Sequence, residues 1–264
     1  MDETAPILIF DSGVGGLTVL DELRKLLPQA PVIYAADLAG LPYGEKTEAE
    51  IAARVAGLLG RMSERFRPRL ITIACNTAST IALGMVREVL HVPIVGTVPA
   101  IKPAAAMTGT GTIGLLGTAA TIRQRYVDDL EARFAAGKRL IRHPCPELVA
   151  AAELKLRGGS PDPAVVEAAV AGLRNQDGGE DIDTVVLACT HFPLLADELG
   201  AALGPDVRLV DGAQGIARRL AHLTMGQGFL RISPDIALVT GDLADAEPLL
   251  PVLKRYGLEH LASL

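Results

Sequence analysis

Two of the three cysteines in the chain end segments that are nearly the same. The apolar run 70–74 leads into Cys75, and the similar run 185–188 leads into Cys189. Both runs are rich in β-branched residues and are followed by small polar residues, which predicts a buried strand with a cysteine at its C-terminal end. Open α/β sheets bind ligands at that end of their strands. A matched pair of thiols at such positions indicates chemistry with two equivalent sides.

Other roles for these two thiols fit the pattern less well. A free cysteine is most often an inert core residue, but each of these two precedes a predicted helix start, where the helix dipole favours the thiolate. A cysteine hydrolase built on Cys189 and His191 leaves Cys75 without a role, and His191 could also simply cap the helix that begins at Pro193. A zinc site is a further alternative, although its Cys-x-His spacing is unlike that of structural zinc sites. Its ligands would be Cys189, His191, His143 and Cys145.

A second candidate site follows the first predicted strand, 7–10. The turn Asp11-Ser12-Gly13-Val14-Gly15-Gly16 opens a helix but lacks the lysine of a phosphate-binding loop. Its glycines could serve close packing alone; alternatively, Asp11 and Ser12 project into a cleft, where N–H groups at the helix start attract a carboxylate. Residues 109–114 match the dinucleotide pattern, but those glycines precede a predicted strand, so we interpret the match as chance.

The composition restricts the class of protein. About half of the 264 residues are apolar, which allows a sizeable core, and the net charge is -6 with a pI near 5.4. The basic residues are scattered along an acidic chain, so the sequence predicts no basic surface that would bind nucleic acid or an anionic membrane. Without a targeting signal or an apolar stretch of membrane-spanning length, we expect a cytoplasmic protein with reduced thiols. The short segment before the first strand predicts no N-terminal regulatory extension.

The elements that must position these residues alternate between strand and helix. Alternation of this kind predicts α/β lobes with doubly wound parallel sheets. The predicted strands are 7–10, 32–36, 70–74, 94–97, 112–116, 139–142, 185–189, 207–210 and 236–240. The predicted helices include 45–65, 78–90, 101–107 and 121–136.

The second half of this pattern repeats the first. We predict two similar lobes related by a pseudo-twofold axis, the first comprising 1–98 plus 210–264 and the second 99–209. Lobes that face each other would bring Cys75 and Cys189 to opposite walls of one cleft, which would then hold the active site.

Taken together, the motifs resemble those of the bacterial glutamate racemases, within the aspartate/glutamate racemase superfamily. The matching segments are Phe10-Asp11-Ser12-Gly13-Val14-Gly15-Gly16-Leu17, Asp37 with Pro42-Tyr43-Gly44, Ala74-Cys75-Asn76-Thr77-Ala78 and Leu187-Ala188-Cys189-Thr190-His191-Phe192-Pro193-Leu194-Leu195. The chain departs from the family at 38–41, which reads Leu-Ala-Gly-Leu. The family often has Thr-Ala-Arg at the positions of residues 38–40. It also lacks a second proline after Cys145-Pro146.

This resemblance implies an isomerase that interconverts L- and D-glutamate without a metal or other cofactor and supplies D-glutamate for peptidoglycan biosynthesis. Inversion of a carbon stereocentre needs a base on one face and an acid on the other, and two thiols can exchange these roles. By resemblance, Cys189 with His191 takes the proton from L-glutamate, and Cys75 with Asp11 reprotonates the opposite face. Glu153 is implied as an active-site carboxylate. The implied substrate-binding residues are Asp11, Ser12, Tyr43, Gly44, Asn76, Thr77, Thr118, Thr190 and His191.

Two other function classes stay open at this point. A related racemase or isomerase acting on aspartate, hydantoins or maleate would share both thiols, but the motifs around Ser12 and Tyr43 are those associated with glutamate. A non-catalytic amino-acid sensor would share the lobes and would not need both thiols. Glutamate is the expected partner, with no nucleic acid and no membrane. A homodimer is compatible with the family, although the sequence itself determines no oligomeric state.

Overall fold

The computed structural model describes residues 2–264, which divide into two compact α/β units. The first unit runs up to Thr97 and resumes at Ala213–Leu264, and the second is Val98–Gly212. Each unit has its own parallel sheet, so the predicted α/β class with parallel sheets is confirmed. Within residues 2–264, no helix combines the length and the apolar character needed to cross a membrane.

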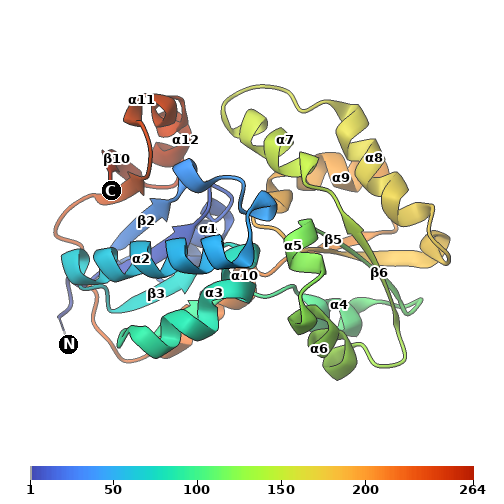
Figure 1. The fold of residues 1–264 in the computed structure, drawn as a ribbon, viewed down its shortest axis with the longest axis horizontal. Helices are drawn as coiled ribbons and strands as arrows, with labels where there is room; N and C mark the ends of the chain where they lie inside the picture. Colours follow the sequence, from blue (N-terminus) through green and yellow to red (C-terminus); the bar gives the residue numbers. More distant parts are fainter. Residues whose placement is uncertain (1) are drawn as a thin grey trace. The chain divides into compact units, whose positions relative to one another are not determined.

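The first unit is built on a six-stranded sheet in the order β10-β9-β2-β1-β3-β4 (Figure 1). Every residue of β1, β2 and β3 is buried, as expected for a parallel sheet with helices on both faces. Helices α1 and α10 pack together, as do α2 and α3. The strands are β1 (Ile7–Asp11), β2 (Val32–Ala36), β3 (Leu70–Ile73), β4 (Ile94–Gly96), β9 (Asp235–Val239) and β10 (Leu258–Ser263). The helices are α1 (Leu17–Leu26), α2 (Glu48–Phe66), α3 (Asn76–Val89), α10 (Ala213–Leu223), α11 (Leu243–Ala246) and α12 (Leu250–Arg255).

Local sequence explains where α2 begins and which face it buries. Thr47 and Glu50 form a reciprocal capping box that satisfies backbone N–H groups at the helix start. The apolar residues of α2 recur every three or four positions, which places them on one face. That buried face consists of Ile51, Val55, Leu59 and Met62.

The second unit contains a four-stranded sheet in the order β6-β5-β7-β8 (Figure 1). Its central strand β5 lies between β6 and β7, and both pairings are parallel. The strands are β5 (Thr112–Gly117), β6 (Arg139–Pro144), β7 (Ile182–Leu187) and β8 (Arg208–Val210). The helices are α4 (Ile101–Met107), α5 (Ala119–Ile122), α6 (Arg125–Phe134), α7 (Glu147–Leu156), α8 (Pro163–Arg174) and α9 (Ala196–Leu203).

One predicted helix differs from the structure. The helix predicted over 121–136 is two helices, α5 and α6, because Gln124 between them is extended, with φ −68° and ψ 131°. The interpretation of 109–114 as a chance match agrees with the fold, since these glycines precede β5 or lie within it and do not open a helix. The elements α11, α12 and β10 have no counterpart among the predicted elements.

Candidate functional site

Cys75 lies between the end of β3 and the start of α3. It is the N-cap residue of α3, and its Sγ accepts the N–H of Ala78 at 3.4 Å. The hydroxyl of Ser12 donates to the same sulfur at 3.4 Å. Hydrogen bonds to sulfur and the positive end of a helix dipole both favour the thiolate over the thiol. Cys75 is therefore a buried thiol in surroundings that stabilise its negative form.

Asp11, at the end of β1, is the fully buried carboxylate behind Ser12. Its oxygens accept the N–H of Ser12 at 2.7 Å and the N–H of Gly16. Only glycine fits at 16, because a Cβ there would lie 2.9 Å from Ala74 Cβ and 2.9 Å from Asp11 Oδ2. The Ser12 hydroxyl is 3.4 Å from Asp11 Oδ1 and 3.4 Å from Cys75 Sγ, so it links the carboxylate to the thiol.

The first residues of α3 present buried polar groups next to Cys75. Asn76 and Thr77 are 7% and 3% exposed. In the described chain, residues 2–264, Asn76 Oδ1 has no hydrogen-bond partner. A buried amide oxygen without a partner is costly, and a binding site is one place where this occurs in native proteins. Asn76 is thus a polar group that a ligand would satisfy.

Tyr43 also lies beside Cys75. It begins the 3₁₀ helix η2 (Tyr43–Glu45), which includes Gly44, and its ring belongs to the same buried apolar cluster as Cys75. The Tyr43 hydroxyl donates to Asp37 Oδ2 at 2.6 Å. Burial, and to a smaller extent this hydrogen bond, raises the pKa of Tyr43 well above its ordinary value. The hydroxyl is therefore a fixed donor and not a proton source.

In the second unit, Cys189 follows β7 and has a different set of partners. Its Sγ is 3.9 Å from His191 Nδ1, and His191 Nε2 is 2.9 Å from Glu153 Oε1. All three side chains are buried. A carboxylate that accepts the Nε2 proton leaves Nδ1 directed at the sulfur, where it can exchange a proton with it. The alternative in which the His191 side chain caps a helix is wrong, because it makes no capping hydrogen bond to η4 (Phe192–Leu195).

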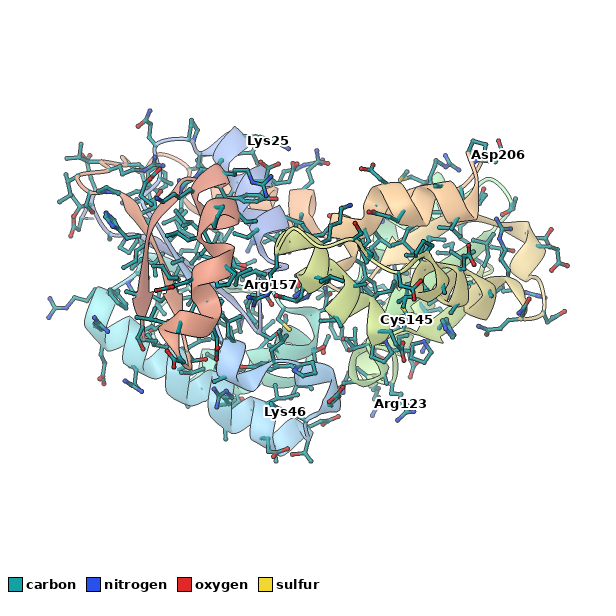
Figure 2. All side chains as sticks on the ribbon, turned by 90° about the horizontal axis from the view of Figure 1, so that it is seen from above. Lys25, Lys46, Arg123, Cys145, Arg157 and Asp206 are labelled. Carbon is teal, nitrogen blue, oxygen red and sulfur yellow. The ribbon has the colours of Figure 1, made fainter. Side chains whose placement is uncertain are left out.

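Helix α7 carries the groups that hold this chain of contacts in place. Lys155 donates to the carbonyl of Leu194 at 2.9 Å, which ties α7 to η4 just after His191. Arg157, at the C-terminal end of α7, has Nη2 3.7 Å from Glu153 Oε2 (Figure 2). The contact between Glu153 and His191 joins residues that are 38 positions apart in the chain.

The remaining predicted residues of this unit lie at the same edge of its sheet. Thr118 follows β5 and caps α5, with Oγ1 accepting the Thr121 N–H at 3.2 Å. Thr190 is buried between Cys189 and His191. These hydroxyl groups lie at the carboxyl ends of the strands, where the fold class binds ligands.

Cys145, labelled in Figure 2, directly follows β6. It is 2% exposed, and burial, with a smaller contribution from Cys189, raises the pKa of its thiol far above the ordinary value. The two sulfur contacts of Cys145 are backbone carbonyl oxygens, of Gly117 and His143, both at 3.9 Å. Carbonyl oxygens accept a hydrogen bond from a thiol and oppose a thiolate.

The structure also bears on the zinc alternative. Across residues 2–264, no group of three or more His, Cys, Asp or Glu side chains is arranged to hold a metal ion. The ring of His143 instead lies against Gly172 of α8, where a Cβ would be 2.1 Å from its Nε2.

Comparison with known proteins identifies the family. The model of the Asp/Glu/Hydantoin racemase family matches residues 17–220. The chain belongs to this family. It is 63% identical over 261 residues to the glutamate racemase of Sphingopyxis alaskensis, covering 98% of this chain and 97% of that one. It is 46% identical to the glutamate racemase of Salmonella typhimurium, covering 98% and 91% of the two chains.

Solved structures of the family have the same fold. The structure of Escherichia coli glutamate racemase in complex with L-glutamate and the activator UDP-MurNAc-ala matches with a TM-score of 0.92 and 44% identity, covering 98% of both chains. Glutamate racemase RacE1 of Bacillus anthracis matches with a TM-score of 0.81 and 28% identity, covering 98% and 97%. An aspartate racemase homologue from Pyrococcus horikoshii, 21% identical with a TM-score of 0.51, shares the fold alone.

Proposed function

We propose that this chain is a cofactor-independent glutamate racemase that uses Cys75 and Cys189 as its two acid–base groups. It is an isomerase of the glutamate racemase family, as the 63% identity over nearly the whole chain establishes. One observation supports the two-thiol mechanism most directly. Each cysteine follows a strand of a parallel sheet, and each sulfur has its own polar partner, Ser12 for Cys75 and His191 for Cys189.

In the proposed reaction with L-glutamate, the Cys189 thiolate removes the α-proton. The Cα–H bond breaks, its electron pair stays on the substrate as a carbanion, and the proton ends on sulfur. The Cys75 thiol then donates its proton to the opposite face of Cα and becomes a thiolate. His191 and Ser12 stabilise the thiolate forms of the two cysteines. The reverse reaction exchanges the two roles, as microscopic reversibility requires.

The carbanion must be stabilised, because the α-proton is far less acidic than a thiol, whose ordinary pKa is about 8.5. Donors held in place before the reaction supply such stabilisation without reorganisation. Candidate donors are the side chains of Ser12, Asn76, Thr77, Thr118 and Thr190 and the backbone of Tyr43 and Gly44. The amide oxygen of Asn76, which has no partner within residues 2–264, is in addition an acceptor for the ammonium group of the substrate.

The proposal includes the organisation of the protein around its substrate. The two lobes, 1–98 plus 210–264 and 99–209, would place the thiols on opposite faces of glutamate. The product D-glutamate would enter peptidoglycan biosynthesis in the cytoplasm, and glutamate would be the partner, with neither nucleic acid nor membrane involved. A homodimer is the oligomeric state proposed.

Circular dichroism of the purified protein tests the substrate. Optical activity of L-glutamate should decay to zero, whereas L-aspartate at the same concentration should keep its signal. The variant Cys75→Ser, with its folding checked by a thermal melt, is the matched control, because it removes one acid–base group. Racemisation of aspartate at a rate equal to that of glutamate would contradict the assignment of glutamate as the substrate. Decay of the circular dichroism of L-glutamate at the wild-type rate with Cys75→Ser would contradict the two-thiol mechanism.

A further inference from the structure

A buried carboxylate network lies one residue beyond β2, outside the groups assigned above. Asp37 is fully buried and accepts hydrogen bonds from three side chains. Tyr43 donates its hydroxyl proton at 2.6 Å, Arg54 donates from Nη2 at 2.6 Å and also from Nε, and Thr240 donates its hydroxyl proton. These partners come from η2, α2 and the end of β9, so one carboxylate joins three separate segments of the first unit.

We infer that Asp37 and Arg54 are positioning residues for the Cys75 half of the reaction, because they fix Tyr43, which belongs to the buried cluster that contains Cys75. The inference rests on the proposed function and extends it to two residues that do not touch the sulfur. The Tyr43 ring packs in the cluster that contains Cys75, and η2 packs against α3, the helix that Cys75 caps. The hydroxyl at the far end of the ring is the atom that Asp37 fixes.

The charge of the network keeps this arrangement in one state. Burial by itself raises the pKa of Asp37, but the hydrogen bonds from Arg54, Thr240 and Tyr43 outweigh it and hold the pKa below its ordinary value. Asp37 is therefore an acceptor at neutral pH, and Tyr43 must be the donor. The guanidinium of Arg54 compensates a buried negative charge that would otherwise oppose a thiolate at Cys75.

The backbone at Gly40 passes so close to Asp37 and Arg54 that no side chain fits at this position. A Cβ at position 40 would lie 2.4 Å from Asp37 Oδ2 and 2.7 Å from Arg54 Nε. Here the position lacks a side chain, and the guanidinium that neutralises Asp37 reaches it from α2.

The same two strands provide an internal control at their other end. Asp235 opens β9 and is 4% exposed, and it forms ion pairs with Arg24 and, at 3.3 Å, with Arg231. Its Oδ1 also accepts the N–H of Val32 at 2.7 Å, at the start of β2. Because the strands are parallel, Asp235 lies at the edge of the sheet opposite to Asp37. This second buried Asp–Arg pair has the same chemistry and lies at the opposite end of the parallel strands from Cys75.

The test compares Arg54→Gln and Asp37→Asn with Arg24→Gln and Asp235→Asn. For each purified variant, kcat and KM are measured with L- and D-glutamate, with and without deuterium at Cα, together with a thermal melt. In Arg54→Gln and Asp37→Asn, kcat/KM should fall about 10- to 100-fold, the range that a misplaced reacting group produces. In the two control variants kcat/KM should stay within about twofold, whatever the change in melting temperature.

Isotope effects separate positioning from general damage. Cys75 takes the proton from D-glutamate, so the deuterium effect on kcat/KM should rise with D-glutamate and fall with L-glutamate in Arg54→Gln. Arg54→Lys, which keeps the charge but not the bidentate geometry, should recover part of the activity. Tyr43→Phe keeps the ring and removes only the anchored hydroxyl, so it should show the same asymmetry even where Asp37→Asn fails to fold.

Three outcomes would overturn the inference. Equal losses of kcat/KM in Arg54→Gln and Arg24→Gln would show that the Asp37 pair is only structural. Isotope effects that change equally with both enantiomers in Arg54→Gln and Tyr43→Phe would show that the pair does not act through Cys75. A wild-type protein that does not racemise glutamate would remove the proposed function itself, and with it this inference, whereas an active wild type with either of the first two results removes the inference alone.

Discussion

Cys75 and Cys189 occupy equivalent places at the ends of parallel strands, but their surroundings differ in kind. Cys75 is stabilised by fixed donors, the Ser12 hydroxyl and the Ala78 N–H. Cys189 faces an imidazole that is itself held by the Glu153 carboxylate. Fixed donors stabilise a thiolate without taking up its proton, whereas an imidazole can accept and return one. The two halves of the chain thus share the position of a thiol and not the means of activating it.

Cys145 shows that a position at the end of a parallel strand does not by itself stabilise a thiolate. It also follows a parallel strand and is buried, but its sulfur lies near the carbonyl oxygens of Gly117 and His143 and has no donor comparable to Ser12. Its raised pKa keeps it a thiol. What distinguishes the two proposed reactive cysteines from this third one is the polar partner on the sulfur.

The largest expected effect comes from removing either proposed reactive thiol. Cys75→Ser and Cys189→Ser each leave one face of the substrate with a hydroxyl, a far weaker acid and base. Racemisation should fall about 10²- to 10⁴-fold, the usual contribution of general acid–base catalysis. Racemisation rates by circular dichroism, with thermal melts to establish folding, are the measurement. A folded serine variant that works at nearly the wild-type rate would end the two-thiol mechanism.

A smaller and directional effect is expected from the partners of the thiols. His191→Asn and Glu153→Gln should slow the step at Cys189, and Asp11→Asn should slow the step at Cys75. Because the equilibrium constant between enantiomers is one, the two values of kcat/KM must change together, and the asymmetry appears in deuterium isotope effects. The effect should rise with L-glutamate for His191→Asn and Glu153→Gln, and with D-glutamate for Asp11→Asn. The opposite pattern would exchange the two assignments, and equal effects would argue against separate partners.

Cys145→Ser should change activity by less than about threefold and alter stability mainly at high pH. A thiol whose pKa is raised on folding contributes stability that is fully present below its unfolded pKa, about 8.5, and is lost as the pH rises above that value. The melting temperature of the wild type should therefore fall between pH 8 and 10 more steeply than that of Cys145→Ser. If the melting temperatures of the two proteins change equally with pH, the pKa of this thiol is not raised on folding. A folded but inactive Cys145→Ser variant would show that Cys145 takes part in the reaction.

No loss of activity is expected on removal of metals or carbonyl cofactors. In the proposed mechanism two thiols supply the acid and the base, so racemisation should persist after exhaustive chelation and after treatment with hydroxylamine. Activity before and after each treatment is compared at equal protein concentration. Loss that is restored by adding a metal ion or pyridoxal phosphate would refute the proposed chemistry.

Sequence patterns predicted the elements whose limits are set locally. The strand at 32–36 and the helix at 101–107 have the observed bounds, because prolines precede both runs and their apolar spacing has a single period. The turn after β1 and the polar residues after both cysteines were also apparent from the sequence. Local signals could place these groups at strand ends, which is most of the candidate site.

What the sequence did not predict depends on contacts between distant segments. The pair Asp37 and Arg54 joins a loop to the middle of a helix, and neither residue differs in type from ordinary surface charges. Resemblance to a family implied Glu153 only as an active-site carboxylate, and its contact with His191 was not predicted, since no spacing rule connects positions on α7 and after β7. Strand β10 (Leu258–Ser263) reads Leu-Glu-His-Leu-Ala-Ser, which lacks the alternation of apolar and polar residues that would predict a strand.

The interrupted course of the first unit has a consequence for synthesis on the ribosome. Strand β2 pairs with β9, whose first residue follows the last residue of β2 by 199 positions, 235 minus 36. At translation rates of about 5–20 residues per second, this edge of β2 remains unpaired for roughly 10–40 s until β9 is synthesised. The second unit, continuous from Val98 to Gly212, is fully synthesised within that interval. The nascent chain therefore carries an unpaired, apolar strand edge while its later half folds, and this is the stage at which protection by a chaperone would matter most.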